Sequence, residues 1–260
     1  MLNLVTCLHV VASLRPAAGG PSRTVAQLAD ALAGEDGLNV SLLSQGVVNE
    51  PFIQPQAAAV AYRICQSTSR QALRLGWPVR SELARIMRRS PPSLIHNNGL
   101  WLPVNFWAAR AARLHGVPLV VQPHGMLEPW ALQHKALKKR LAMALFQWRD
   151  LQAANVLVAT SAGEYRNLRH LGLSQPVAII PNGIDLTAAE GSKVGHARTG
   201  GDRTALFLSR VHKKKGLTNL VQAWAQVQPT GWRLQIAGPD EGGHLAEVLR
   251  EAQAVGVAGS

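Results

Sequence analysis

Cysteine is scarce in this sequence, and its placement indicates neither a metal site nor a redox site. Only Cys7 and Cys65 occur among the 260 residues, without the spacing of a zinc site or of a disulfide oxidoreductase. Because Cys7 lies in an apolar run, we expect it to be a buried packing residue. Nothing in the cysteine content indicates an oxidising compartment.

Long apolar runs are also missing. No segment reaches the roughly 18 consecutive apolar residues that a membrane-spanning helix needs, although apolar residues make up 47% of the chain and can fill a core. Residues 1–11 are apolar but lack a basic leader and a cleavage site, so they predict a first strand rather than a signal peptide. We expect a cytoplasmic protein, either free or peripheral on the inner face of the membrane.

Acidic residues are few, with 15 Asp and Glu against 27 Lys and Arg, and the formal net charge is +12. Such a surplus attracts nucleic acid, anionic lipid or phosphorylated ligands. The sequence has neither zinc-finger spacing nor an RNA-recognition signature, so we expect no nucleic-acid partner. It also lacks an Asp-x-Asp motif, and we expect neither a metal site nor a cofactor.

The sequence does contain a regular alternation of short strand-like runs and helical patterns. Helices are predicted at residues 24–33, 104–115 and 162–170, and strands at 2–11, 39–43, 94–96, 119–122, 155–159 and 177–180. Alternation of this kind forms βαβ units around a parallel sheet. Residues 1–189 therefore predict an α/β domain of Rossmann-like topology.

The polar segment 190–202 has no apolar period and predicts a linker. After it come strands at 204–209 and 232–237 and helices at 217–227 and 245–254, while the apolar residues 255–260 suggest a further strand. A doubly wound domain usually has five or six strands. We therefore expect residues 203–260 to be an incomplete second domain with an uncovered apolar face, from truncation, a split gene or fragmentation.

Loops after the predicted strands carry the candidate site residues, because ligands bind at the carboxyl ends of parallel strands. Gly19 and Gly20 precede a helix start that suits phosphate, with Ser22 offering a hydroxyl; an ordinary strand-to-helix turn is the alternative. His124, between a proline and a glycine, is placed to hydrogen-bond a ligand unless it is a solvated loop residue. Asn182 lies in a tight turn that either meets the ligand or only enters the linker.

A further polar stretch, residues 96–105, lies between a strand and a helix. We expect its polar side chains to face the crevice. The alternative is structural, with His96 a hydrogen-bonded packing residue and Trp101 a core aromatic.

The most informative loop follows the strand predicted at 204–209. Arg210 can grip a phosphate with two parallel hydrogen bonds, Lys215 adds a mobile charge, and Gly216 introduces a helix whose N-terminal N–H groups attract anions. Together these features predict a diphosphate clamp; a solvated basic loop is the alternative.

Residues 135–149 predict a basic amphipathic helix. Its apolar stripe and its cations are Leu137, Leu141, Leu145 and Trp148, and Lys135, Lys138, Lys139 and Arg140. Such a stripe either lies on an anionic membrane or faces the core with its lysines in water.

The ordered motifs Gly-Gly-Pro-Ser, His-x-x-Gly-x-Trp, Pro-His-Gly-Met, Pro-Asn-Gly-Ile-Asp, Ser-Arg-x4-Lys-Gly and Ala-Gly-Pro-Asp resemble those of family 4 (group 1) glycosyltransferases. These are retaining enzymes with the GT-B fold of two Rossmann-like domains. The resemblance runs along the whole chain and is particularly to members that assemble bacterial exopolysaccharide, capsule or O-antigen.

The resemblance implies hexosyl transfer from a nucleotide sugar to a saccharide or lipid-linked acceptor. His124 would contact the transferred sugar, and Arg210 and Lys215 would bind the leaving diphosphate. The other implied binding positions are Gly19, Gly20, Asn182, Gly216 and Gly238. Family members also carry two glutamates seven residues apart and a C-terminal helix that returns to the first domain. Neither is in this sequence, so an inactive fragment is one expectation.

Two other functions stay open, a non-catalytic acceptor- or membrane-binding module and a nucleotide-sugar epimerase of the same fold. A nicotinamide-dependent enzyme is not indicated. It would need Gly-x-Gly-x-x-Gly after the first strand, where this chain has only the adjacent Gly19 and Gly20.

Overall fold

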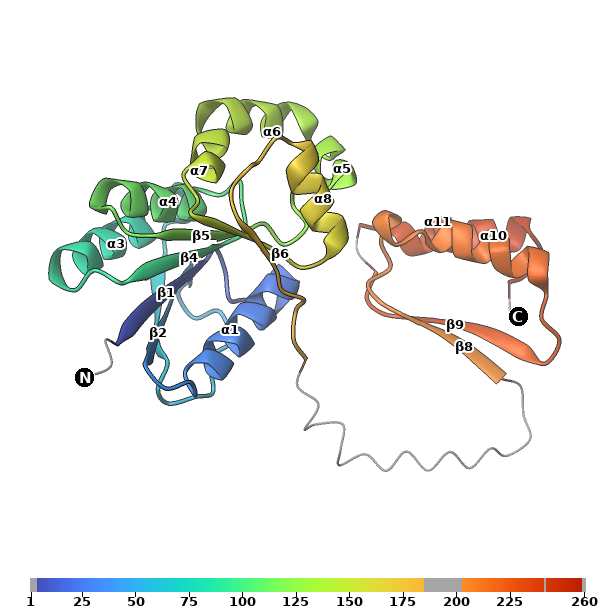
Figure 1. Ribbon diagram of the computed structural model, residues 1–260. Helices are drawn as coiled ribbons and strands as arrows, with labels where there is room; N and C mark the ends of the chain where they lie inside the picture. Colours follow the sequence, from blue (N-terminus) through green and yellow to red (C-terminus); the bar gives the residue numbers. More distant parts are fainter. Residues whose placement is uncertain (1–3, 185–202, 241, 259–260) are drawn as a thin grey trace. The chain divides into compact units, whose positions relative to one another are not determined.

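The structure, a computed structural model, describes residues 4–184, 203–240 and 242–258. The chain divides into two compact units, Met1–Asp185 and Leu186–Ser260 (Figure 1). The predicted linker, 190–202, lies outside the described residues.

The first unit is built on a parallel sheet of seven strands in the order β3-β2-β1-β4-β5-β6-β7. The strands are β1 Val5–Val11, β2 Leu38–Val47, β3 Ala61–Ser67, β4 Leu94–Asn98, β5 Leu119–Gln122, β6 Val156–Ala159 and β7 Val177–Ile179. The sheet grows from β1 in one direction and from β4 in the other. The gap between these two strands is therefore a topological switch point, where open parallel sheets bind ligands.

Helices lie on both faces of this sheet. They are α1 Gly20–Leu32, α2 Arg70–Arg74, α3 Trp77–Arg89, α4 Pro103–His115, α5 Pro129–Gln133, α6 Ala136–Ala142, α7 Trp148–Gln152 and α8 Ala162–His170. A short 3-10 turn, Pro16–Ala18, precedes α1, and a π-helical segment, Met143–Gln147, joins α6 to α7. Because βαβ crossovers are right-handed, the reversal at β1 places α1 on the face opposite α3 and α4 (Figure 1).

The core is correspondingly divided. The larger apolar cluster joins the sheet to α3, α4 and α8 and includes Leu83, Ala108 and Leu168. The smaller cluster lies under α1 and includes Val25 and Val40. On the α1 side, residues of β4 to β7 line an open groove instead of packing against a described helix.

The helical run from α6 to α7 corrects one prediction. Its stripe was expected to face either a membrane or the core, and the core alternative is wrong, because Leu137, Leu141 and Leu145 are 81%, 61% and 71% exposed. The inward side is formed instead by residues such as Met143 and the buried Gln147.

The second unit holds a parallel pair of strands, β8 Arg203–Leu208 and β9 Trp232–Ala237. Helices α10 Leu217–Val227 and α11 His244–Ala254 both lie on one face of this pair (Figure 1). On the other face Leu206 and Leu208 are 59% and 75% exposed, which confirms the predicted uncovered apolar face.

The further strand suggested after α11 is not formed in the described residues 255–258. The Val257 N–H donates to the Ala252 carbonyl across Gly256, whose φ is +76°. This left-handed glycine ends the helix and folds Val257 back against the core of the unit.

Candidate functional site

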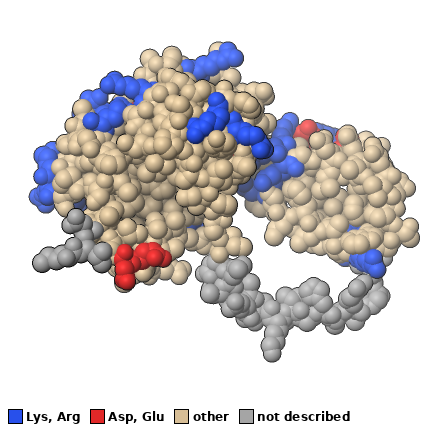
Figure 2. Space-filling model, in the orientation of Figure 1, with Lys and Arg blue, Asp and Glu red and all other residues tan. Residues whose placement is uncertain are grey.

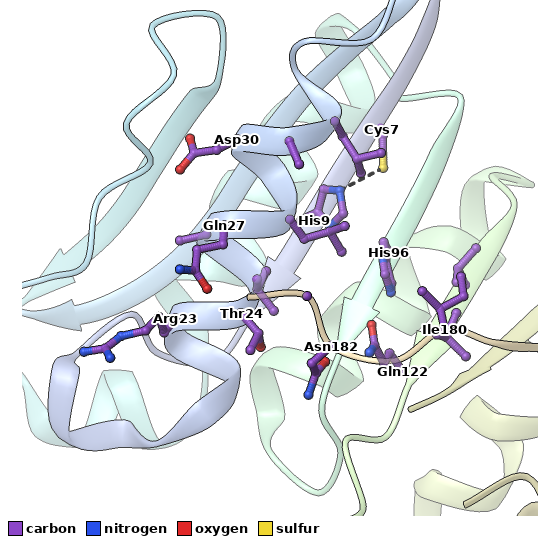
Figure 3. Close-up of a pocket in the computed structure, with 18 of the residues that line it drawn as sticks. Cys7, His9, Arg23, Thr24, Gln27, Asp30, His96, Gln122, Ile180 and Asn182 are labelled. Carbon is purple, nitrogen blue, oxygen red and sulfur yellow. Dashed lines mark hydrogen bonds between the residues drawn. The ribbon is translucent and has the colours of Figure 1, made fainter. Parts of the chain in front are cut away.

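A groove of about 960 Å³ runs over the sheet of the first unit. Its floor comes from β1, β4, β5, β6 and β7, one wall from α1, and the other from residues 180–184. In β1, β4 and β5 the early positions contribute apolar side chains and the later ones contribute His9, His96 and Gln122, with His124 following β5. Figure 3 shows Thr24 of α1 and Asn182 near this polar end.

Two buried histidines form part of the groove floor. The rings of His9 and His96, on neighbouring strands, have centroids 4.9 Å apart. Burial lowers the pKa of His9 to about 4 and that of His96 to about 3, so both rings are neutral at pH 7. His9 Nδ1 and His96 Nε2 have no hydrogen-bond partner within the described parts of the chain. His96 is thus a packing residue that hydrogen-bonds with the Gln122 side chain, as its structural alternative predicted, while its Nε2 is unused.

His124 lies just beyond β5 in a left-handed conformation, with φ of +54°. Its Nε2 is 3.2 Å from Asn98 Oδ1, and Asn98 Nδ2 donates to the His96 carbonyl. The Asn98 oxygen therefore accepts, and His124 Nε2 donates. Burial lowers the pKa of His124 to about 4. In the neutral ring Nδ1 is consequently a hydrogen-bond acceptor.

Glu164 of α8 is a residue of this site that the sequence analysis missed. Its buried carboxylate accepts from the Gly125 N–H at 2.6 Å and from the Thr160 N–H and hydroxyl at 2.7 Å each. It thereby joins the His124 loop to the loop after β6. The available signal was the Ser161-x-x-Glu164 capping pattern, in which Ser161 Oγ accepts from the Glu164 N–H at 3.1 Å.

The polar stretch 96–105 is mainly structural: His96 lines the groove, but the other polar side chains that were expected to face the crevice do not. Asn97 and Asn105 are buried, and Asn105 Nδ2 donates both to Asn97 Oδ1 and to the Asn98 carbonyl at 2.9 Å. Trp101 is partly buried against the main core, as its structural alternative predicted. Only Asn98 reaches a candidate ligand-binding residue.

The turn before α1 leaves its backbone accessible. Gly19 has φ of +102°, and a Cβ built on Gly19 or Gly20 would meet no atom within 4 Å. The Ser22 hydroxyl is not available as expected, because it is buried and donates to the Ser13 carbonyl at 3.0 Å. An anion here would meet backbone N–H groups of a 13-residue helix and not the serine.

In the second unit, the predicted clamp residues lie on the loops that follow β8 and β9. Lys213–Lys215 forms a 3-10 turn, and Gly216, with φ of +67°, is the N-cap of α10. No side chain caps α10, so its first-turn N–H groups have no side-chain acceptor at the end of the loop that carries Arg210 and Lys215. Gly238 has a packing role, since a Cβ there would lie 1.9 Å from the Ser209 carbonyl oxygen.

One of the three loop lysines is held by an acid. Lys213 Nζ lies 3.0 Å from Glu247 Oε2, which is also 3.1 Å from the buried His244 Nδ1. Lys215, the lysine of the predicted clamp, is exposed beside the start of α10. Lys213 thus serves as a natural internal comparison for Lys215.

The predicted site residues therefore gather within each unit. His124 and Asn182 line the groove of the first unit, and Gly19 and Gly20 begin the helix that forms its wall. Arg210, Lys215, Gly216 and Gly238 share the loop end of the second unit. Asp185 lies outside the described residues. Within residues 4–184, 203–240 and 242–258, no group of three or more His, Cys, Asp or Glu is arranged to hold a metal ion.

Comparison with known families identifies the chain. Residues 18–188, more than half of its length, match the model of Glycosyltransferase Family 4. The chain belongs to this family. No curated protein matches this family 4 chain by sequence.

Solved structures similar to this family 4 chain share its fold. HepE of Anabaena, in complex with UDP-glucose, has a TM-score of 0.60 and 17% identity over 98% of this chain and 67% of its own. The lipopolysaccharide outer core galactosyltransferase WaaB has a TM-score of 0.60 and 15% sequence identity, and the match covers 97% of this chain and 65% of WaaB. A Listeria monocytogenes protein assigned as a UDP-N-acetylglucosamine 2-epimerase has a TM-score of 0.56 and 14% sequence identity, and the match covers 98% of this chain and 67% of that protein.

The expected GT-B fold is confirmed by these comparisons. The chain spans about two thirds of the length of these structures.

Proposed function

We propose that the protein transfers a hexosyl group from a nucleotide diphosphate sugar to a hydroxyl acceptor with retention of anomeric configuration. The observation that carries this proposal is that Arg210, Lys215 and the uncapped start of α10 all belong to the connection that follows β8. Family membership supports it, as does the UDP-glucose bound in the structure of HepE.

The leaving group explains why cations are needed at this position. When the glycosidic bond to the donor breaks, negative charge develops on the diphosphate oxygens. Arg210 would bind two of these oxygens in parallel, Lys215 would add a charge, and the α10 N–H groups would add a fixed dipole. Preorganised positive groups of this kind stabilise the transition state without a divalent ion.

His124 would position the transferred sugar. Asn98 fixes its ring, and Nδ1 is left as an acceptor for a sugar hydroxyl. Because the ring is neutral at pH 7, it can accept this hydrogen bond without repelling the positive charge that develops on the sugar ring. Asn182, Gly19 and Gly20 would contact donor or acceptor from the other sides of the groove.

The acceptor would be a saccharide or a lipid-linked saccharide at the cytoplasmic side of a bacterial membrane, in polysaccharide synthesis. The similarity to WaaB, which is described as a galactosyltransferase of lipopolysaccharide, supports this class of acceptor. A nucleotide-sugar epimerase is the second candidate, because a protein assigned to that activity shares the fold at a similar TM-score.

The test is to incubate the protein with labelled UDP-, GDP- and ADP-sugars, with and without saccharide acceptors. We expect acceptor-dependent release of one nucleoside diphosphate and a product with the donor's anomeric configuration. Conversion of a nucleotide sugar into its epimer without acceptor would support the second candidate. Absence of turnover together with acceptor binding would indicate a non-catalytic module.

A further inference from the structure

The outer side of the helical run from α6 to α7 carries an apolar stripe that packs against nothing described. We call Leu137, Leu141 and Leu145 the leucine stripe. The three lie four residues apart, so they project from one side of the run. Trp148 continues the stripe and is also exposed, and Trp130 of the preceding α5 is exposed as well.

Cations surround the leucine stripe. Lys135, Lys138, Arg140 and Arg149 are exposed along this run. Lys139 instead turns inward, where its Nζ donates to the Ala131 carbonyl and lies 5.6 Å from the Trp101 ring.

Acids are correspondingly scarce on this side. Between residues 129 and 152 the single acidic residue is Asp150, which is buried and paired with Arg113. Figure 2 shows Lys and Arg along the upper surface of the first unit, where α6 lies, and the visible acids of that unit at its lower edge. The exposed charges of this run are therefore all positive, and the exposed acid that precedes it in the chain is Glu128.

We propose that this face binds the surface of an anionic phospholipid bilayer. The leucine stripe would enter the boundary between headgroups and acyl chains, and the flanking cations would meet lipid phosphates. Trp130 and Trp148 would lie at the same boundary between headgroups and acyl chains, because indole rings favour the membrane interface. None of the helices in the described part of the chain is long and apolar enough to span a bilayer.

Charge favours a membrane over a second copy of the chain. A two-fold interface through this face would bring two cationic surfaces together, so Lys138 and Arg140 would lie among the cations of the other copy. Anionic lipid instead neutralises them. Neither the diphosphate clamp nor His124 takes part in this binding, which is independent of the proposed function.

The experiment is co-sedimentation of the full 260-residue chain with vesicles of phosphatidylcholine alone or of equimolar phosphatidylcholine and phosphatidylglycerol. We expect binding to the anionic vesicles only, and weakening by salt. The variant Leu137→Ser/Leu141→Ser/Leu145→Ser should bind at least roughly tenfold more weakly. Lys138→Glu/Arg140→Glu should lose about tenfold or more.

Matched controls use exposed residues away from this face. Leu249→Ser removes an exposed leucine of α11, and Arg70→Glu/Arg74→Glu reverses two exposed cations of α2. Both controls should bind as the wild type does. Because all substituted side chains are exposed, circular dichroism should show every variant folded.

Three outcomes would overturn the proposal. They are no binding of the wild type to anionic vesicles, equal binding to neutral vesicles, and unchanged binding of the leucine variant. Sedimentation velocity without lipid adds a fourth: a wild-type dimer that the leucine variant converts to monomer would assign the face to a second copy.

Discussion

Glu164 accepts a hydrogen bond from the backbone N–H of Gly125, although 39 residues separate them in the chain. The same carboxylate binds two donors of Thr160. It therefore fixes the backbone next to His124, while Asn98 fixes the imidazole ring itself through a hydrogen bond. The conformation of the His124 loop depends on a residue that would contact no substrate.

Replacing Glu164 should destabilise the first unit. Glu164→Ala leaves up to three buried donors without an acceptor, so we expect the free energy of unfolding to fall by about 2–4 kcal/mol. Glu164→Gln keeps one side-chain oxygen as an acceptor, so its free energy of unfolding should fall by less. Urea denaturation followed by tryptophan fluorescence measures both.

The exposed Glu128, replaced by alanine, is the control and should change stability by less than about 0.5 kcal/mol. Equal stability of Glu164→Ala and wild type would show that these hydrogen bonds do not hold the loop.

Acid should destabilise the protein through its buried histidines. Burial lowers the pKa of His9, His96 and His124 from 6.5 to about 4, 3 and 4. As pH falls below 6.5 the unfolded chain binds protons before the folded chain does. This contribution to stability is therefore complete above pH 6.5 and is lost as pH falls towards 4.

Thermal unfolding between pH 7 and pH 4 measures this effect. We expect the Tm to fall over that range, and to fall less steeply for His9→Leu, which removes one of the three groups. A wild-type Tm that is constant from pH 7 to pH 4 would contradict the assignment of neutral, buried rings.

Strand and helix positions were predicted best where local chemistry sets their ends. Strand β5 has its predicted bounds, because Pro118 and Pro123 flank it. Helix α8 also has its predicted bounds, since Ser161 caps its start. Helix α3 was missed. Four arginines obscure its apolar face. Its buried Glu82 is paired with Arg85 of the same helix and also with Arg63 of β3, and no local pattern reveals the second partner.

In the candidate site too, the residues set by local sequence were predicted and those set by remote contacts were not. His124 was found because a histidine directly after a predicted strand must lie at the carboxyl edge of the sheet. Glu164 was not, because a helical glutamate is usually solvated and its partner Gly125 is remote in sequence. The leucine stripe could not be assigned to core or surface, since periodicity shows that a helix has an apolar side but not what that side contacts.

Gly238 should tolerate no side chain. In Gly238→Ala the new Cβ would meet the Ser209 carbonyl oxygen at 1.9 Å, so the loops after β8 and β9 must separate. We expect a loss of more than about 2 kcal/mol of stability and faster hydrogen exchange of the β9 amides. Gly231→Ala is the matched control, because Gly231 also has positive φ, +72°, but open space around it, and it should cost about 1 kcal/mol. Equal effects of the two substitutions would show that backbone conformation, and not the Ser209 contact, requires glycine at 238.

The most direct measurement is isothermal titration calorimetry of UDP, GDP and ADP with the wild type, Arg210→Ala, Lys215→Ala and Lys213→Ala. We expect the wild type to bind at least one diphosphate. Loss of a charged hydrogen bond should weaken this binding about tenfold or more in Arg210→Ala and in Lys215→Ala. Lys213→Ala should have a smaller effect, since Lys213 is paired with Glu247. Unchanged affinity in both clamp variants, or no diphosphate binding by the wild type, would show that this loop is not a diphosphate clamp.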